Sequence, residues 1–109
     1  MIASSRPLHE VSSRSGDPVK SFQSMLFFVY VLQSSKDKKF YTGYTRDLKG
    51  RFEEHSKGRV SSTKDRRPLK LIYYEACISK EDALHRENYL KTHHGRMFLG
   101  KRLKSYLTG

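Results

Sequence analysis

Residues 25–32, MLFFVYVL, form an uninterrupted apolar run that constrains the fold more than any other segment of the chain. Aromatic and β-branched side chains dominate this run, which is typical of a strand covered on both faces. The polar residues 34–39 then allow a turn, and residues 40–44, FYTGY, are predicted to return as a second strand. The folded part of the chain is therefore expected to begin with a β-hairpin.

The middle of the chain is predicted to add one helix and one strand. Residues 47–57 predict a helix that Thr45 or Asp47 can cap. Gly58 can end this helix, because glycine adopts the left-handed conformation that often follows a last turn. After a basic loop, residues 69–76, LKLIYYEA, have the aliphatic and aromatic content of a third strand.

The last third of the chain is predicted to contain two helices. Ser79 and Asp82 resemble a capping box at the start of a helix over residues 80–93. A final basic helix is expected over residues 96–107, with its leucines and Tyr106 on the inner face.

These spans give the order β-β-α-β-α-α. The predicted fold class is α/β (α+β), with a small, three-stranded, mainly antiparallel sheet flanked by helices. The pattern leaves the strand order open. Residues 1–24 are rich in serine and show no helix or strand period, so we predict a disordered extension ahead of one domain over residues 25–109.

The charge of the chain indicates its class of partner. The 22 lysines and arginines outnumber the 11 acidic residues and give a formal net charge of +11. Such a charge on a small body favours polyanions, above all nucleic acid, with ribosomes and acidic membrane surfaces as alternatives. No apolar run is long enough to span a bilayer, which excludes an integral membrane protein, and the single Cys77 excludes an internal disulfide.

Glu87 does not fit a purely structural account of its helix. Ala83, Leu84 and Leu90 mark the buried side of that helix, and their spacing places Glu87 on the same side. Since an unpaired buried carboxylate is costly, Glu87 is expected to have a cationic partner. An arginine or a divalent metal ion would both serve.

Two other pairs are candidate site residues. Arg51 and His55 are separated by four positions, so both project from one side of the first helix. A solvated basic helix face would explain them equally well. Tyr30 and Tyr41 are expected to face each other across the hairpin, either as core aromatics with satisfied hydroxyls or as part of a site.

Together these positions resemble the GIY-YIG nuclease superfamily. Residues 28–30, FVY, and residues 41–43, YTG, are similar to the two motifs that name the superfamily. Arg51, His55 and Glu87 match its helix arginine, the histidine one turn later and its metal-binding glutamate. The resemblance covers the whole predicted domain and is closest to small stand-alone bacterial members.

The resemblance implies a role for each of these side chains. Glu87 would hold one divalent metal ion, Mg²⁺ or Mn²⁺, beside the scissile phosphate. Arg51 would neutralise the charge that grows on phosphorus, and Tyr30 would be the general base. Tyr41 and His55 would position the attacking water or share its proton. The basic residues expected to grip the DNA backbone are Lys57, Lys64, Arg66 and Arg67.

The implied function is a metal-dependent endonuclease that hydrolyses DNA phosphodiester bonds in repair or recombination. Its substrates would be branched, damaged or single-stranded DNA, selected by structure rather than by sequence. A bacterial cytoplasmic location, with association with the nucleoid, and a monomeric state are expected. The alternative is a non-catalytic nucleic-acid-binding module, which one departure favours: many active members carry a C-terminal asparagine, and the only asparagine here is Asn88.

Overall fold

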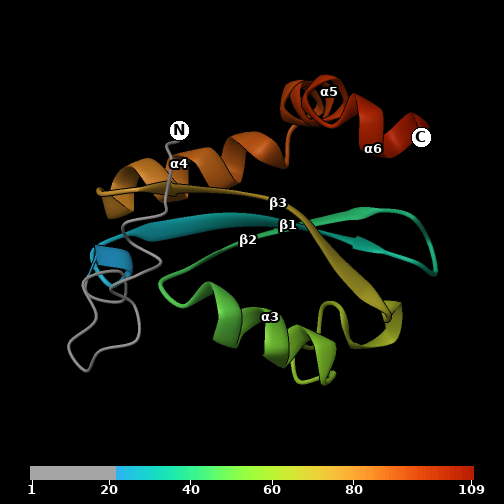
Figure 1. Cartoon of the computed structure of the whole chain (residues 1–109), viewed down its shortest axis with the longest axis horizontal. Coiled ribbons are helices and arrows are strands. Elements are labelled where there is room, and N and C mark those ends of the chain that lie inside the picture. The colour runs from blue at the N-terminus through green and yellow to red at the C-terminus, as the bar shows by residue number, and fades with distance from the viewer. Residues whose placement is uncertain (1–21) are drawn as a thin grey trace, which may run out of the picture.

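The computed structural model describes residues 22–109 and contains one three-stranded sheet. The strands are β1 (Phe27–Ser34), β2 (Phe40–Thr45) and β3 (Leu69–Cys77). β1 pairs antiparallel with both neighbours, so the strand order is β2-β1-β3 (Figure 1). The predicted antiparallel sheet is confirmed, and the apolar run lies in its central strand because that strand is covered on both faces.

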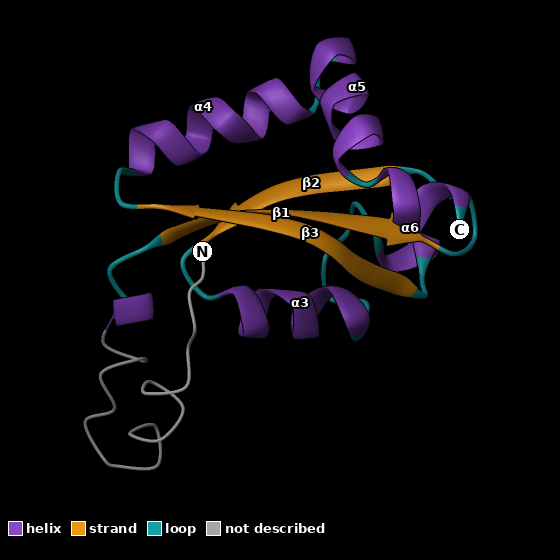
Figure 2. Cartoon of the chain, turned by 45° about the horizontal axis from the view of Figure 1, so that its top comes forward, coloured by secondary structure: helices purple, strands orange, loops and turns teal. Residues whose placement is uncertain are grey.

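Helices lie on both faces of the sheet. Figure 2 shows α4 (Lys80–Leu90) over one face and α3 (Leu48–Ser56) under the other, and Figure 1 shows α5 (His93–Arg102) and α6 (Lys104–Thr108) on the same side as α4. A short 3₁₀ helix, η1, joins α3 to β3. The helical elements are α3 (Leu48–Ser56), η1 (Lys64–Arg66), α4 (Lys80–Leu90), α5 (His93–Arg102) and α6 (Lys104–Thr108).

The two faces of β1 pack against different helices. Val29 and Val31 point to the α4 face, where they form the main core with Ala83, Leu90 and Leu99. The alternate residues of β1 point to the α3 face, because successive side chains of a strand leave on opposite sides. Packing of the core therefore fixes which β1 side chains are turned towards α3.

Side-chain caps set the starts of the helices. The Asp47 carboxylate accepts a hydrogen bond from Gly50 N at 3.1 Å, so Asp47, rather than Thr45, caps α3. Ser79 Oγ accepts from Asp82 N at 3.4 Å and caps α4, as its sequence predicts. Gly58 has a φ of 77° just beyond α3, as expected of a residue that ends a helix.

The prediction of one final helix over residues 96–107 was wrong. Thr92 Oγ1 accepts a hydrogen bond from Gly95 N at 3.1 Å, so a new helix, α5, begins at His93 and α4 ends at Leu90. Leu103 then interrupts the helix, with a φ of −108°, and α6 follows it. The observed order is therefore β-β-α-β-α-α-α, and Tyr106 is 41% exposed rather than packed inward.

The predicted extension over residues 1–24 lies almost entirely outside the described residues. Its last residues touch the domain, since Arg46 Nη2 donates a hydrogen bond to the Ser24 carbonyl oxygen at 2.7 Å. Within residues 22–109, none of the helices has the length and apolar character that a membrane span requires.

Candidate active site

A pocket of about 620 Å³ wraps around the β2 edge of the sheet. β2 lines its centre, α3 contributes from one face of the sheet, and α4 with the start of α5 contributes from the other. The edge position matters because only there can side chains from helices on opposite faces reach one cavity. The pocket brings together all five predicted catalytic residues: Tyr30, Tyr41, Arg51, His55 and Glu87.

A chain of hydrogen bonds links four of the lining residues. Thr63 Oγ1 lies 2.7 Å from His55 Nδ1, and His55 Nε2 lies 2.9 Å from the Tyr30 hydroxyl. Arg51 Nε donates to the same hydroxyl at 3.3 Å. Tyr30, His55 and Thr63 are 4%, 3% and 1% exposed, so the chain runs from the protein interior to the half-exposed Arg51.

The surroundings of His55 keep its ring uncharged. Burial lowers the pKa of His55 below its ordinary 6.5, and the nearby Arg51 cation lowers it further. A neutral imidazole has one donor and one acceptor nitrogen, so it can link the hydroxyls of Tyr30 and Thr63 in a defined direction. The hydrogen bond to Tyr30 raises the pKa of Arg51, which stays charged beside the phenol.

The basic loop holds Thr63 in this position. The Thr63 backbone N–H donates to the Val60 carbonyl at 3.1 Å. Ser34 Oγ, at the end of β1, donates to the Arg66 carbonyl at 2.6 Å and ties the loop to the sheet. No sequence pattern pointed to Thr63, since it stands among polar and basic residues that resemble an ordinary exposed loop.

Tyr41 does not face Tyr30, contrary to the expectation from the hairpin. The register pairs Tyr30 with Gly43 and Tyr41 with Leu32, because the turn between the strands sets the pairing. The Tyr41 hydroxyl donates to Asp37 Oδ2 at 2.7 Å, and this bond raises the pKa of Tyr41. Tyr41 therefore lies in the same pocket with its proton held by a carboxylate.

Gly43 leaves the space that the Tyr30 phenol occupies. A Cβ placed at Gly43 would collide with the phenol oxygen of Tyr30 across the hairpin. The YTG motif therefore requires glycine at position 43 for a steric reason. The strand register places the Tyr30 phenol where any larger side chain would need to be.

Glu87 supplies the acidic side chain among the residues that line the pocket. Its carboxylate is half-buried, and Lys91 Nζ lies 3.1 Å from Oε2. The expected partner was an arginine or a metal ion, but the structure gives a lysine one turn along α4. The neighbouring Arg86 pairs instead with Glu75, at 2.8 Å.

A single carboxylate in an open pocket fits one Mg²⁺ or Mn²⁺ ion. Such ions keep several water ligands and are commonly held by one or two carboxylates together with substrate phosphate oxygens. Residues 22–109 contain no group of three His, Cys, Asp or Glu side chains that could enclose a metal ion. Glu87 would therefore share the ion with water and phosphate rather than bury it in a protein cage.

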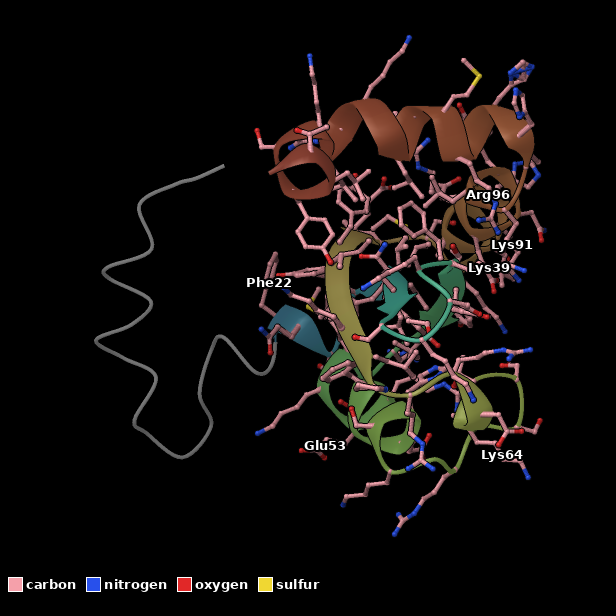
Figure 3. The ribbon with its side chains drawn as sticks, turned by 90° about the vertical axis from the view of Figure 1, so that its right-hand side faces the viewer. Phe22, Lys39, Glu53, Lys64, Lys91 and Arg96 are labelled. Carbon is pink, nitrogen blue, oxygen red and sulfur yellow. The ribbon has the colours of Figure 1, made fainter. Side chains whose placement is uncertain are left out.

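The predicted DNA-gripping residues lie outside this pocket, on exposed surface. Arg66 lies 3.6 Å from Asp37, and Arg67 Nε donates to the Lys64 carbonyl at 2.9 Å. Lys57 follows α3 and is exposed. The cations that do line the pocket, besides Arg51, are Lys39, Lys91 and Arg96 (Figure 3). No sequence pattern pointed to these three cations, since each resembles an ordinary surface residue of a turn or helix.

Comparison with known proteins identifies the family. The family model described as GIY-YIG catalytic domain matches residues 26–107, which is most of the chain. The chain belongs to the GIY-YIG family. The resemblance of its motifs to this nuclease family is thereby confirmed, and GIY-YIG nucleases generally depend on a divalent metal ion and act on DNA.

The relatives are small proteins of similar extent. A UPF0213 protein of Staphylococcus aureus strain Mu3 is 43% identical over 67 residues, which are 61% of this chain and 80% of the relative. A UPF0213 protein of strain Mu50 has the same values. Among solved structures, the solution NMR structure of a UPF0213 protein from Bacillus halodurans is similar, with 32% sequence identity and a TM-score of 0.46. The matched region spans 71% of this chain and 84% of the Bacillus halodurans chain.

Proposed function

We propose that this protein is a metal-dependent endonuclease that hydrolyses DNA phosphodiester bonds in the pocket at the β2 edge. The observation that carries the proposal is the contact of the Tyr30 hydroxyl with both Arg51 and His55, in the same pocket as the Glu87 carboxylate. A phenol between a fixed cation and a neutral imidazole is suited to proton transfer.

Tyr30 is assigned the role of general base. With His55 Nδ1–H donating to Thr63, Nε2 accepts a hydrogen bond from the Tyr30 hydroxyl at 2.9 Å and orients the phenol. When Tyr30 releases its proton to solvent, the Arg51 cation stabilises the phenolate, which takes a proton from the attacking water. The hydroxide forms a bond to phosphorus, the bond to the 3′ oxygen breaks, and that oxygen takes a proton from solvent.

Arg51 has a second role at the phosphate. Its Nη1 pairs with Glu54 at 3.0 Å, and its side chain is 38% exposed at the pocket. A guanidinium placed there neutralises the charge that develops on the phosphate oxygens in the transition state. Glu87 would hold one Mg²⁺ or Mn²⁺ ion, which when bound supplies Lewis-acid stabilisation of the phosphate and of the leaving 3′ oxygen.

Selection of DNA by structure rather than by sequence belongs to the same proposal. The lining side chains can bind phosphate, and contacts of that kind position a strand without reading its bases. Lys57, Lys64, Arg66 and Arg67 would add contacts to flanking backbone. We propose branched, damaged or single-stranded DNA as substrate, a monomer as the acting species, and a role in repair or recombination in the bacterial cytoplasm.

The test compares two glutamate substitutions. Purified wild-type protein, Glu87→Gln and Glu53→Gln are incubated with supercoiled, single-stranded and branched DNA in Mg²⁺, Mn²⁺ or chelator. Glu53 is an exposed residue of α3 outside the pocket (Figure 3). We expect cleavage that requires metal, a loss of at least about 100-fold in Glu87→Gln and no change in Glu53→Gln. Equal rates in both variants would refute the role of Glu87.

A non-catalytic nucleic-acid-binding module is the second candidate. The absence of an asparagine beyond Asn88 favours it, as does the pairing of Glu87 with Lys91. It predicts binding that weakens steeply with salt, no effect of metal and no cleavage of any of the three DNA forms. The same incubation distinguishes the two candidates.

A further inference from the structure

Three exposed cations gather on the pocket wall formed by β2, α4 and α5. Lys39 immediately precedes β2, Lys91 is the C-cap of α4, and Arg96 lies in the first turn of α5. All three line the pocket that contains Glu87, and Figure 3 shows them close together near α4, with Lys64 of η1 well below them. The fold thus brings together cations that are distant in sequence.

Two of these cations have no acidic partner. Within residues 22–109, neither the Lys39 ammonium nor the Arg96 guanidinium forms an ion pair. Lys91 pairs with Glu87, and it loses that partner whenever the carboxylate binds a divalent ion. With Arg51, the pocket lining then carries four cationic side chains and one acidic one.

Unpaired cations beside a hydrolytic site are suited to bind an anion. A guanidinium can donate two parallel hydrogen bonds to phosphate oxygens, and lysine ammonium groups bind phosphate as point charges. Arg51 already serves the phosphate that is to be cleaved, so the other three cations are available for a neighbouring one. Along a DNA strand the next phosphate is the anion that always lies within reach.

We infer that Lys39, Lys91 and Arg96 form a second phosphate site, which holds the DNA backbone phosphate adjacent to the scissile one. The inference rests on the proposed function, since it needs DNA in the pocket. It assigns the path of the strand: from Arg51, across the β2 edge, towards the start of α5.

The experiment measures DNA binding in the absence of cleavage. Wild-type protein, the triple variant Lys39→Gln, Lys91→Gln, Arg96→Gln, and a control triple variant are titrated with a fluorescent single-stranded oligonucleotide in chelator at several salt concentrations. The control is Lys80→Gln, Lys101→Gln, Lys104→Gln, which removes the same charge from exposed residues outside the pocket. Circular dichroism melting checks that all three proteins fold.

In chelator Lys91 keeps its Glu87 partner, so loss of the Lys39 and Arg96 contacts should reduce the slope of log K against log salt by about 1.4, at about 0.7 for each contact with a single strand. The control triple variant should keep a slope close to that of wild type. Equal slopes in the two variants would show that only net charge matters and would overturn the inference. Because this binding assay contains no metal and needs no cleavage, its result is separate from the Glu87→Gln test of the nuclease proposal.

Discussion

At the scale of the residue, the hydroxyl groups of two tyrosines in one pocket have partners of opposite charge character. Tyr30 meets a cation and a neutral imidazole, whereas Tyr41 donates its proton to the Asp37 carboxylate. A carboxylate acceptor raises the pKa of Tyr41 and so opposes its ionisation. The contacts therefore favour Tyr30 as the base and leave Tyr41 to position water or substrate.

Removal of each phenol oxygen should separate these roles. We expect Tyr30→Phe to lower kcat/KM by about 10²- to 10⁴-fold, the usual contribution of a general base. Tyr41→Phe should cost about tenfold or less, because it removes a positioning hydroxyl. Single-turnover cleavage of a branched substrate measures both rates. A larger loss in Tyr41→Phe than in Tyr30→Phe would reverse the assignment.

His55 should make the stability of the protein depend on pH. Because burial lowers its folded-state pKa below 6.5, the unfolded chain binds the extra proton more readily at acid pH. This contribution to stability is fully present above about pH 6.5 and is lost as the pH falls through the folded pKa. Urea unfolding at pH 7.5 and pH 5.5 should show a smaller pH effect in His55→Gln than in wild type.

The exposed His85 of α4 provides the control for this measurement. His85→Gln should keep the pH dependence of wild type, because His85 lies outside the pocket and its hydrogen-bond chain. Cleavage by wild type should fall over the same acid interval, since a protonated His55 can no longer accept the hydrogen bond from the Tyr30 hydroxyl. An unchanged pH effect in His55→Gln would show that another group is responsible.

At the scale of the element, the α4–α5 junction places the wall of the pocket. Thr92 ends one helix and starts the next, which turns the chain so that Lys91 and Arg96 face one cavity. The buried Gly95 allows the helices to approach closely. A Cβ at Gly95 would collide with the Tyr89 carbonyl oxygen and would lie 2.6 Å from Leu90 Cα.

Two glycines of α5 should respond oppositely to alanine. Gly95→Ala should destabilise the protein by at least about 2 kcal/mol, because backbone atoms of α4 block the new methyl group. Gly100→Ala should stabilise it by about 0.5–1 kcal/mol, since a Cβ there meets no atom within 4 Å and alanine is the better helix former. Thermal melting of both variants measures the two shifts, and shifts of the same sign would contradict the packing argument.

At the scale of the whole molecule, positive charge opposes the compact state. The chain carries a formal net charge of +11, and residues 22–109 form four ion pairs, all with partly exposed members. Ion pairs of this kind each contribute at most about 1 kcal/mol. Repulsion among the remaining cations should therefore dominate the surface electrostatics.

Salt should accordingly stabilise the free protein while it weakens DNA binding. Raising NaCl from about 20 mM to 200 mM shortens the Debye length to below about 10 Å and screens the repulsion, so Tm should rise. Melting curves in one buffer at several NaCl concentrations test this. A Tm that falls with salt would show that the ion pairs outweigh the net charge.

The amount that could be predicted from the sequence differs between fold and site. The strands, the Ser79 cap and the fold class followed from local patterns, because period and capping act within a few residues, whereas the choice of Asp47 over Thr45 as a cap came from the structure. The prediction of one final helix over residues 96–107 was wrong because Leu103, with a φ of −108°, interrupts it, and the helix begins earlier than predicted because Thr92 Oγ1 caps its first turn.

The sequence by itself determined the three strands, the first two helices, the family motifs and the positions of Arg51 and His55 on one side of a helix. Only the tertiary structure decided that His55 connects Thr63 to Tyr30, that Gly43 faces the phenol, and that three distant cations share the pocket with Glu87. The physical reason is the distance along the chain over which each interaction acts. Helix and strand periods are local, whereas strand register and the packing of helices on opposite faces of the sheet bring together atoms whose distance no local pattern encodes.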